Sequence, residues 1–591
     1  MSRDISKDNL REQFNLLGVN VGDAVLEKCA ELCEAHGVDE EELVETWMAY
    51  SLSKLSGADP TLDSLRQMAR ACFKAVALPT SSRPPATATA SPLVIYNAVS
   101  SAPTMDDDIL SAYDTTPKTK GKFAGSTVRT PDNVKVTNTS RSPRATFSPA
   151  SFSPSAGNVS AKYLQRTNAG DVVFSHGDTK GRSWRPADDC RLRPAIQPLA
   201  GAPPVPADAR YMFQQMRDGA AVLDYSVDWL GSQLVTKHDL GHPTRLDSAS
   251  PEQVWVVGRV CCDGTGRLNP CSVMLEGLRS LSSGVATPCN LRLLTRYSLF
   301  PGQVVALQAT NHSGEQLLAH ALHTDVTLPL PTIPPRLGPA EELELVVAAG
   351  PFTQMDTLGY QPLEDLVAYV RLHRPHVLLL IGPFIDCNHG LVADGSLAQT
   401  FQSFFDKLLD GILEPLAESG TQVVLVPSPR DAHHHAVYPC PPYSLRRQYA
   451  GVHLASDPCV LDVQGVVVAA TSVDTLLHLG KEEISMPAQS GDRLGRLASH
   501  VLAQQSFYPL YPSDESLSVD AELWEQHARL PVSPHLLLLP SDLRFFIKEL
   551  SGCVVVNPER LAKGVVGGSF ARLVVSVVED HTSVSGEIVK I

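Results

Sequence analysis

Apolar residues near the N-terminus recur every three or four positions in several successive segments. That spacing places them on one face of an α-helix, so it predicts short helices packed around a shared core. The three stripes are Leu10, Phe14 and Leu17, then Val25, Cys29 and Leu32, then Leu43, Trp47 and Tyr50. Gly37 stands where a helix would end, and Asp39 and Thr61 are residue types that cap helices. Residues 1–77 are therefore predicted to form a helical bundle, of a size that suits docking.

Residues 161–335 combine one long helical pattern with several short strand patterns. The helical pattern covers 207–236, and the clearest strand patterns cover 254–260, 272–276 and 303–307. Short strands joined by turns and longer loops are typical of a small curved barrel. We therefore expect a β-barrel domain with a flanking helix.

In residues 341–591, apolar runs that suit buried strands alternate with helical segments. The predicted strands are 345–349, 376–381, 423–426, 466–470, 536–539, 554–556 and 573–578, and the predicted helices are 362–372 and 397–413. Continuous apolar strands separated by helices predict a sheet that is covered on both faces. The C-terminal part is thus expected to be an α/β sandwich, and the whole chain to be multidomain.

Residues 78–160 are rich in proline, serine and threonine and poor in large apolar residues. Such a segment cannot offset the entropy of ordering its backbone, so it is predicted to be a disordered linker. Five of its hydroxyl residues precede a proline, a context that proline-directed kinases read in extended chains. These candidate phosphorylation sites are Thr116, Thr130, Ser142, Ser148 and Ser153.

A basic stretch lies in the same linker. Residues 117–146 contain seven lysines or arginines against one acidic residue. Lys118, Lys120 and Lys122 form a candidate nuclear-import patch, although a solvated linker charge would look the same. Nuclear localisation is the expectation.

Composition narrows the class of partner. The 591-residue chain has a formal net charge of −15, which disfavours a strong affinity for nucleic acid over its whole surface. Its 12 cysteines form no Cys-x-x-Cys pair, the N-terminus has no apolar signal core, and no apolar run approaches the roughly 20 residues of a membrane span. We therefore expect a reducing compartment, protein partners and no membrane contact.

Six stretches resemble a known family. They are Phe147–Ser155, Tyr297–Val305, Gly382–Asp386, Val426–His434, Pro540–Phe546 and Asn557–Gly564. In this order, over nearly the whole chain, they are similar to the B-subunit family of the replicative DNA polymerases, in particular its DNA polymerase alpha branch. The resemblance implies an oligonucleotide-binding-type (OB) barrel in residues 161–335 and an inactive calcineurin-like phosphoesterase sandwich in residues 341–591.

The resemblance also implies a role. Such subunits have no polymerase activity, clasp the zinc-bearing C-terminal domain of the catalytic subunit, and connect the polymerase to primase. Replication-fork factors would bind through the N-terminal bundle and the linker. No cofactor is expected, and any contact with DNA would be weak or indirect.

A two-metal phosphoesterase centre needs several carboxylates and imidazoles at successive strand ends. The resemblance implies that Asp386 and Asp431 are vestigial metal-site positions, that Pro383 stands at the bridging position and that Arg430 replaces a histidine. We therefore expect no catalytic residue and no metal site. The triplet at 433–435 is expected on an exposed loop.

Two other functions stay open on sequence grounds. One is an active metal-dependent phosphodiesterase or nuclease, for which the histidine triplet would supply ligands. The other is a single-strand DNA-binding module, because barrels of this type often stack bases on aromatic side chains. Against the second, the barrel strands show no regular interleaving of aromatic and basic residues, and Trp255 and Tyr297 suit a core or an interface.

Phosphorylation of the linker should change partner binding without changing the fold, because the added charge touches no packed core. Replacing all five candidate hydroxyl residues with Asp or Glu should leave the melting temperature of the full chain unchanged. Differential scanning calorimetry checks this. A shift of several degrees would mean that the segment is packed.

Overall fold

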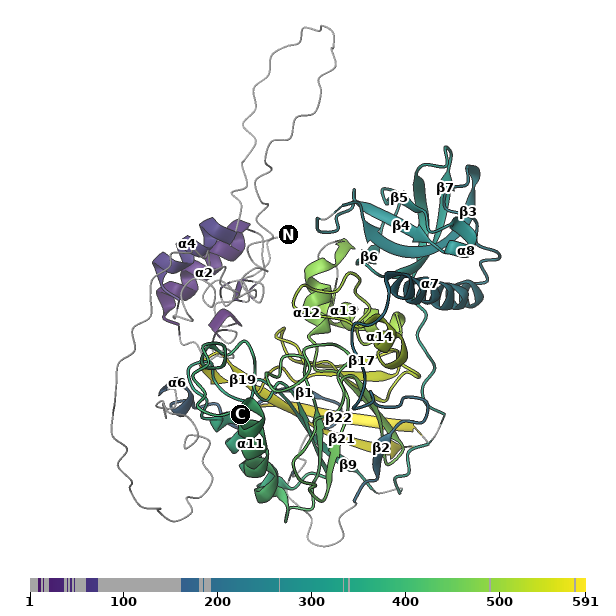
Figure 1. Ribbon diagram of the computed structural model, residues 1–591. Coiled ribbons are helices and arrows are strands. Elements are labelled where there is room, and N and C mark those ends of the chain that lie inside the picture. The colour runs from purple at the N-terminus through teal and green to yellow at the C-terminus, as the bar shows by residue number, and fades with distance from the viewer. Residues whose placement is uncertain are drawn as a thin grey trace, which may run out of the picture. The chain divides into compact units, whose positions relative to one another are not determined.

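The computed structural model describes two units, Met1–Ala145 and Thr146–Ile591 (Figure 1). The described residues are 9–11, 14, 21–36, 40, 43, 44, 47, 60–72, 161–179, 184, 193–264, 266–332, 334–338, 341–487, 491–578 and 581–591. All five linker hydroxyl residues and the three lysines of the import patch lie outside them.

The first unit contains α2 (Asp23–His36) and α4 (Leu62–Cys72). Their apolar faces share one core with residues of the predicted stripes, among them Leu10, Phe14, Cys29 and Trp47. The predicted cap at Thr61 is present, because its hydroxyl accepts a hydrogen bond of 3.2 Å from the backbone N–H of Ser64. Leu17 and Tyr50 lie outside the described residues.

Two sheets form the body of the second unit. The seven-stranded sheet has the order β1-β22-β21-β9-β10-β11-β12, and the six-stranded sheet has the order β17-β18-β16-β14-β13-β2. The first comprises β1 (Val172–His176), β9 (Leu343–Ala349), β10 (Val377–Ile381), β11 (Gln422–Val426), β12 (Val452–Leu454), β21 (Ser569–Val578) and β22 (His581–Lys590). The second comprises β2 (Ile196–Pro198), β13 (Cys459–Val463), β14 (Val466–Ala470), β16 (Leu536–Leu538), β17 (Phe546–Leu550) and β18 (Cys553–Asn557).

Successive side chains of each strand point to opposite faces of the sheet, and this produces the layers of the sandwich. In β10, Leu379 and Ile381 enter the core between the two sheets, whereas Leu378 and Leu380 pack against helices on the outer face. Those helices are α9 (Gln361–His373) and α11 (Phe401–Leu416), and α12 (Thr475–Glu482) and α13 (Arg493–Ala503) cover the other sheet. Because both faces of each sheet are covered, the strands read as continuous apolar runs.

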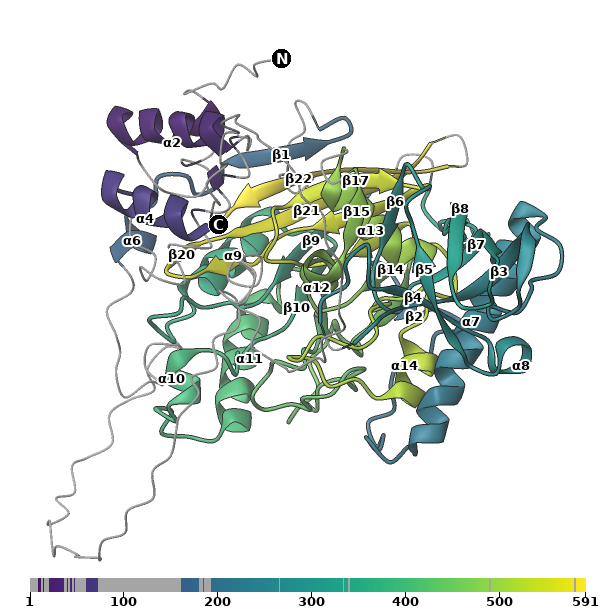
Figure 2. The same cartoon turned by 90° about the horizontal axis from the view of Figure 1, so that it is seen from above.

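A closed barrel is built from β3 (Ser250–Cys262), β4 (Val273–Gly277), β5 (Ala286–Asn290), β7 (Val304–Asn311) and β8 (Leu317–His323), in the order β3-β4-β5-β8-β7. The long helix α7 (Met216–His238) packs on its wall through Val227, Leu230 and Leu234. Gly231 allows this approach, since a Cβ atom there would lie 2.4 Å from a methyl carbon of Val257. Figure 2 shows α7 beside the barrel strands.

The remaining short elements connect these parts. They are α6 (Ala161–Leu164), α8 (Arg279–Ser282), β6 (Tyr297–Leu299), α10 (Gly390–Ala393), β15 (Ile484–Met486), α14 (Ala521–His527), β19 (Ala562–Lys563) and β20 (Val566–Gly567). β6 pairs antiparallel with β15, and this pairing joins the barrel segment to the segment that follows α12.

Buried polar contacts strengthen that junction. The side chain of Gln504 accepts a hydrogen bond of 2.8 Å from the backbone N–H of Val304 and donates one of 3.1 Å to its carbonyl. Glu483, of which 3% of the side chain is exposed, accepts two hydrogen bonds from Arg496, at 2.8 and 2.9 Å, and one from the hydroxyl of Ser298. The ring of His500 lies 3.1 Å from the same carboxylate.

Several sequence expectations need correction. The helix expected over 207–236 begins nine residues later, at Met216. There the carboxylate of Asp218 accepts a hydrogen bond of 2.9 Å from the backbone N–H of Gln215, the N-cap residue. Residues 161–198 were expected with the barrel, but β1 pairs with β22 and β2 pairs with β13 of the sandwich. The sequence patterns also missed β22, because its residues are largely polar and small, and β13, because it contains Asp462.

Replacing Glu483 with Gln should destabilise the unit by about 3 kcal/mol, because it leaves Arg496 without its charged partner in a buried junction. Burial alone would raise the pKa of Glu483, but hydrogen bonds from His500, Arg496 and Ser298 hold it well below the usual range. A lowered pKa in the folded state means that this stabilisation is complete above about pH 4.3, the ordinary glutamate value, and declines as the pH falls below it.

Urea denaturation at pH 7 and at pH 3.5 checks both statements. The difference between the wild type and Glu483→Gln should shrink at the lower pH. Glu515→Gln, a change at an exposed glutamate, is the control and should be neutral at both pH values. An equal cost at both pH values would contradict the assignment.

Candidate functional site

Two carboxylates meet where the parallel strands β10 and β11 end. Asp386 follows β10 and Asp431 follows β11, and the backbones of the two residues form an isolated antiparallel bridge. Carboxyl ends of neighbouring parallel strands share one edge of a sheet, which is where open α/β sheets bind ligands. The structure therefore brings together Asp386 and Asp431, the two residues that the sequence analysis predicted to be vestigial metal-site positions.

Asp431 is enclosed by hydrogen-bond donors. Its side chain accepts hydrogen bonds from the backbone N–H groups of Phe384 and Ile385, at 2.5 and 2.9 Å, and of Ser428, at 3.2 Å. The Tyr443 hydroxyl donates to its second oxygen. Burial raises the pKa of Asp431 to about 7, against the lowering effect of these donors. The carboxylate of Asp431 is therefore already hydrogen-bonded to the loop that follows β10.

Asp386 is paired with Arg430, the residue that the sequence analysis expected to replace a histidine. The Nε atom of Arg430 lies 3.2 Å from one carboxylate oxygen of Asp386, and its Nη2 atom contacts the other. This two-point pair is the geometry that a guanidinium favours with a carboxylate. Burial alone would lower the pKa of Arg430, but Asp386 and then Asp542 raise it above the ordinary arginine value. The guanidinium is therefore a permanent cation at this edge.

A second arginine completes the network. Arg560, only 2% exposed, donates from Nε to Asp542 at 3.0 Å and from Nη2 to Asp474 at 3.2 Å. Asp474 also caps α12, because it accepts a hydrogen bond of 3.0 Å from the backbone N–H of Leu477. Burial alone would raise the pKa of Asp542, but Arg560 and Arg430 hold it below its usual range.

These five groups alternate in sign. The carboxylates of Asp386, Asp542 and Asp474 form ion pairs with the guanidinium groups of Arg430 and Arg560. A pair of divalent metal ions would need the same carboxylate oxygens and would meet two fixed positive charges. The arrangement suits a rigid edge that holds several strand ends together and does not suit hydrolysis assisted by two metals.

The expectation of an exposed histidine triplet was wrong for two of its three members. The ring of His433 stacks on Phe405 at 3.8 Å between centroids and lies 5.3 Å from the ring of Tyr443. Burial lowers the pKa of His433 to about 3 and that of His434 to about 4. Only His435 is exposed. The reason is tertiary packing by α11, which the local sequence does not reveal.

Sequence reasoning missed the roles of Arg560 and Asp474. Arg560 lies in a stretch that carried the family resemblance, but no local pattern indicates that its side chain is buried. Asp474 had one usable signal, because an aspartate directly before a helical segment is a typical N-cap. The partnership of the two residues spans 86 positions of sequence.

The barrel offers little support for base stacking. Trp255 and Tyr297 are both half-buried, and the ring of Trp255 lies 5.2 Å from that of His323. Among the residues that the structure describes, no helix is long and apolar enough to cross a membrane.

Three segments of the chain match known protein families. Residues 345–548 match the family of the B subunits of DNA polymerases alpha and epsilon. Residues 220–324 match the OB domain of the DNA polymerase alpha B subunit, and residues 8–74 match the N-terminal domain of the same B subunit. The first match covers the strand ends that carry Asp386, Arg430 and Asp431.

Comparisons with individual proteins agree with these family matches. The chain is similar to the B subunits of DNA polymerase alpha from several organisms, with 37% identity to that of Rattus norvegicus over 96% of this chain and 95% of the relative. Identity is 34% to that of Drosophila melanogaster, over 96% of each chain. For Saccharomyces cerevisiae it is 26%, over 64% of this chain and 62% of the relative. The chain belongs to the family of DNA polymerase alpha B subunits.

Proposed function

We propose that this chain is a non-catalytic scaffold of the DNA polymerase alpha-primase complex in the nucleus. It binds the zinc-bearing C-terminal domain of the catalytic subunit through the barrel and the sandwich, and links that subunit to primase. The N-terminal helices and the linker recruit replication-fork factors, and phosphorylation of the linker regulates this recruitment.

One observation carries the non-catalytic part of the proposal. Arg430 and Arg560 form ion pairs with the carboxylates at the strand ends where a calcineurin-like phosphoesterase would hold two metals. Replacing divalent ions by covalently attached cations keeps each of these carboxylates paired with a positive charge, so the fold survives without the chemistry. What is left is a stable platform whose surface is free to serve protein partners.

The segment leading into α7 supplies a candidate contact surface for the catalytic subunit. Phe213 and Met216 are 77% and 94% exposed, and Met212 next to them is 49% exposed. Exposed apolar side chains that lie this close together mark protein interfaces more often than ordinary surface. The surface lies where the barrel helix begins, close to α14 of the sandwich, because the backbone N–H of Met212 donates to Asp520, the N-cap of α14.

Binding to the catalytic subunit tests the scaffold. The full chain should copurify with a fragment carrying the zinc-bearing C-terminal domain, and Phe213→Glu/Met216→Glu should weaken this binding at least 10-fold by removing two apolar anchors. Isothermal titration calorimetry measures the change. Leu372→Glu, at a leucine that is 68% exposed on α9, is the matched control and should bind normally. Absence of binding by the wild-type chain would overturn the scaffold proposal.

Hydrolysis assays test the inactive edge. The purified chain with excess Mn²⁺ should hydrolyse neither a generic phosphodiester nor single-stranded DNA above background, because the carboxylates that would bind the ions are already paired. Asp386→Ala should leave this background unchanged. Turnover that rises with Mn²⁺ and is lost in Asp386→Ala would establish the competing phosphodiesterase function instead.

A further inference from the structure

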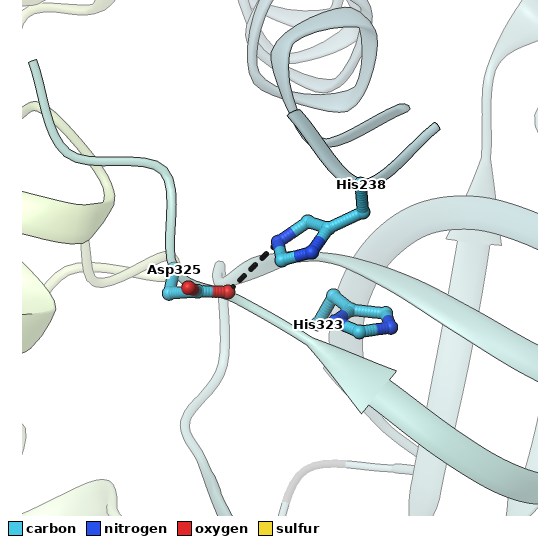
Figure 3. A group of neighbouring side chains, drawn as sticks. All are labelled: His238, His323 and Asp325. Atoms are coloured by element: carbon cyan, nitrogen blue, oxygen red, sulfur yellow. Dashed lines mark hydrogen bonds and ion pairs between the residues drawn. The ribbon is translucent and has the colours of Figure 1, made fainter. Parts of the chain in front are cut away.

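Two histidines and an aspartate converge where helix α7 ends beside the barrel (Figure 3). His238 is the last residue of α7, His323 is the last residue of β8, and Asp325 follows two positions later. One potential ligand atom from each lies within 4.8 Å of the other two. Within the described part of the chain, this is the one group of at least three such side chains with that spacing.

The ligand atoms lie nearly as close together as they would around a bound ion. His238 Nε2 lies 2.9 Å from Asp325 Oδ1, and the two imidazole rings are 4.1 Å apart between centroids. Ligand atoms around a tetrahedral Zn²⁺ are separated by about 3.4 Å, as follows from metal-ligand distances of about 2.1 Å. Asp325 has 66% of its side chain exposed, so its carboxylate has room to rotate into that position.

The donor set selects the class of ion. Two imidazoles and one carboxylate suit Zn²⁺, Co²⁺ or Ni²⁺, and they do not suit Ca²⁺ or Mg²⁺, which prefer oxygen ligands. The C-terminal end of α7 adds a partial negative charge that favours a cation.

A lysine competes for the same carboxylate. Lys237 Nζ lies 3.2 Å from Asp325 Oδ2 and also contacts the Asp325 carbonyl oxygen. Its contact is with the oxygen that His238 does not use. An ion bound through Oδ1 can therefore coexist with Lys237, at the cost of repulsion between the two positive charges.

We propose that His238, His323 and Asp325 form a zinc-class metal site that fastens the C-terminal end of α7 to the barrel. The three side chains supply three ligands, and water supplies the fourth. The ion links two segments that are 85 residues apart in sequence and otherwise held there by apolar packing and by the contacts of Asp325 with His238 and Lys237. This site lies on the barrel and is independent of the carboxylate network of the sandwich.

Metal titration of the full chain tests the proposal. After removal of metals with a chelator, the wild type should bind Co²⁺ with the intense visible absorption of a tetrahedral site, and Zn²⁺ should displace it and raise the melting temperature. His238→Ala and His323→Ala should each weaken binding more than about 100-fold, because even outer-shell partners of metal ligands are worth about 10–100-fold. Equal binding in the wild type and in either variant would overturn the proposal.

Control variants separate this site from the other histidines of the chain. His312→Ala, at an exposed histidine of the same barrel, should retain the absorption and the thermal shift. Asp325→Asn keeps the size of the side chain and should bind Zn²⁺ more weakly, which covers the case in which a histidine variant misfolds. Lys237→Met should bind Zn²⁺ at least as tightly as the wild type, and weaker binding would show that the ion does not lie beside Asp325.

Discussion

One buried guanidinium group holds the edge of the sandwich together. Arg560 ties Asp542, in the loop that follows β16, to Asp474, at the start of α12. Removing one partner of such a pair costs about 3–5 kcal/mol, because a charge is left buried without compensation. The backbone around Arg560 is equally constrained, since a Cβ atom at Gly568 would lie 1.9 Å from the Arg560 carbonyl oxygen. The loop after β16 and the start of α12 therefore both depend on the side chain of Arg560.

The same ion pairs hold the carboxylates of this region in place. Carboxylates gathered at the ends of strands from both sheets repel each other, so they are stable there only beside cations. Arg430 and Arg560 provide those cations from within the chain, with planar groups that bind two oxygens at once. Asp431, whose partners are backbone N–H groups and a tyrosine, instead shapes the loop that follows β10.

Sequence patterns were reliable where burial alone determines structure. β14 was predicted with its observed limits, Val466–Ala470, because an unbroken apolar run flanked by polar residues has few alternatives. Sequence patterns failed where a residue's structure depends on a partner that is distant in the sequence. β22 is polar along much of its length and becomes a strand through ten paired positions with β21. His433 is half-buried because Phe405 of α11 lies over its ring. The positions of Asp386 and Asp431 were predictable, but the salt bridges around them required the tertiary structure.

The junction between barrel and sandwich determines what a partner protein would meet. Gln504 binds both backbone groups of Val304 at the start of β7, and Glu483 binds Ser298 in β6, so sandwich side chains fix the barrel at two successive segments. Buried contacts of this kind have one favourable geometry, because an unpaired polar group in either position would be costly. The barrel and the sandwich are therefore presented in one fixed arrangement. A partner that contacts both would bind without losing entropy to order them, which is the physical advantage of a rigid accessory subunit.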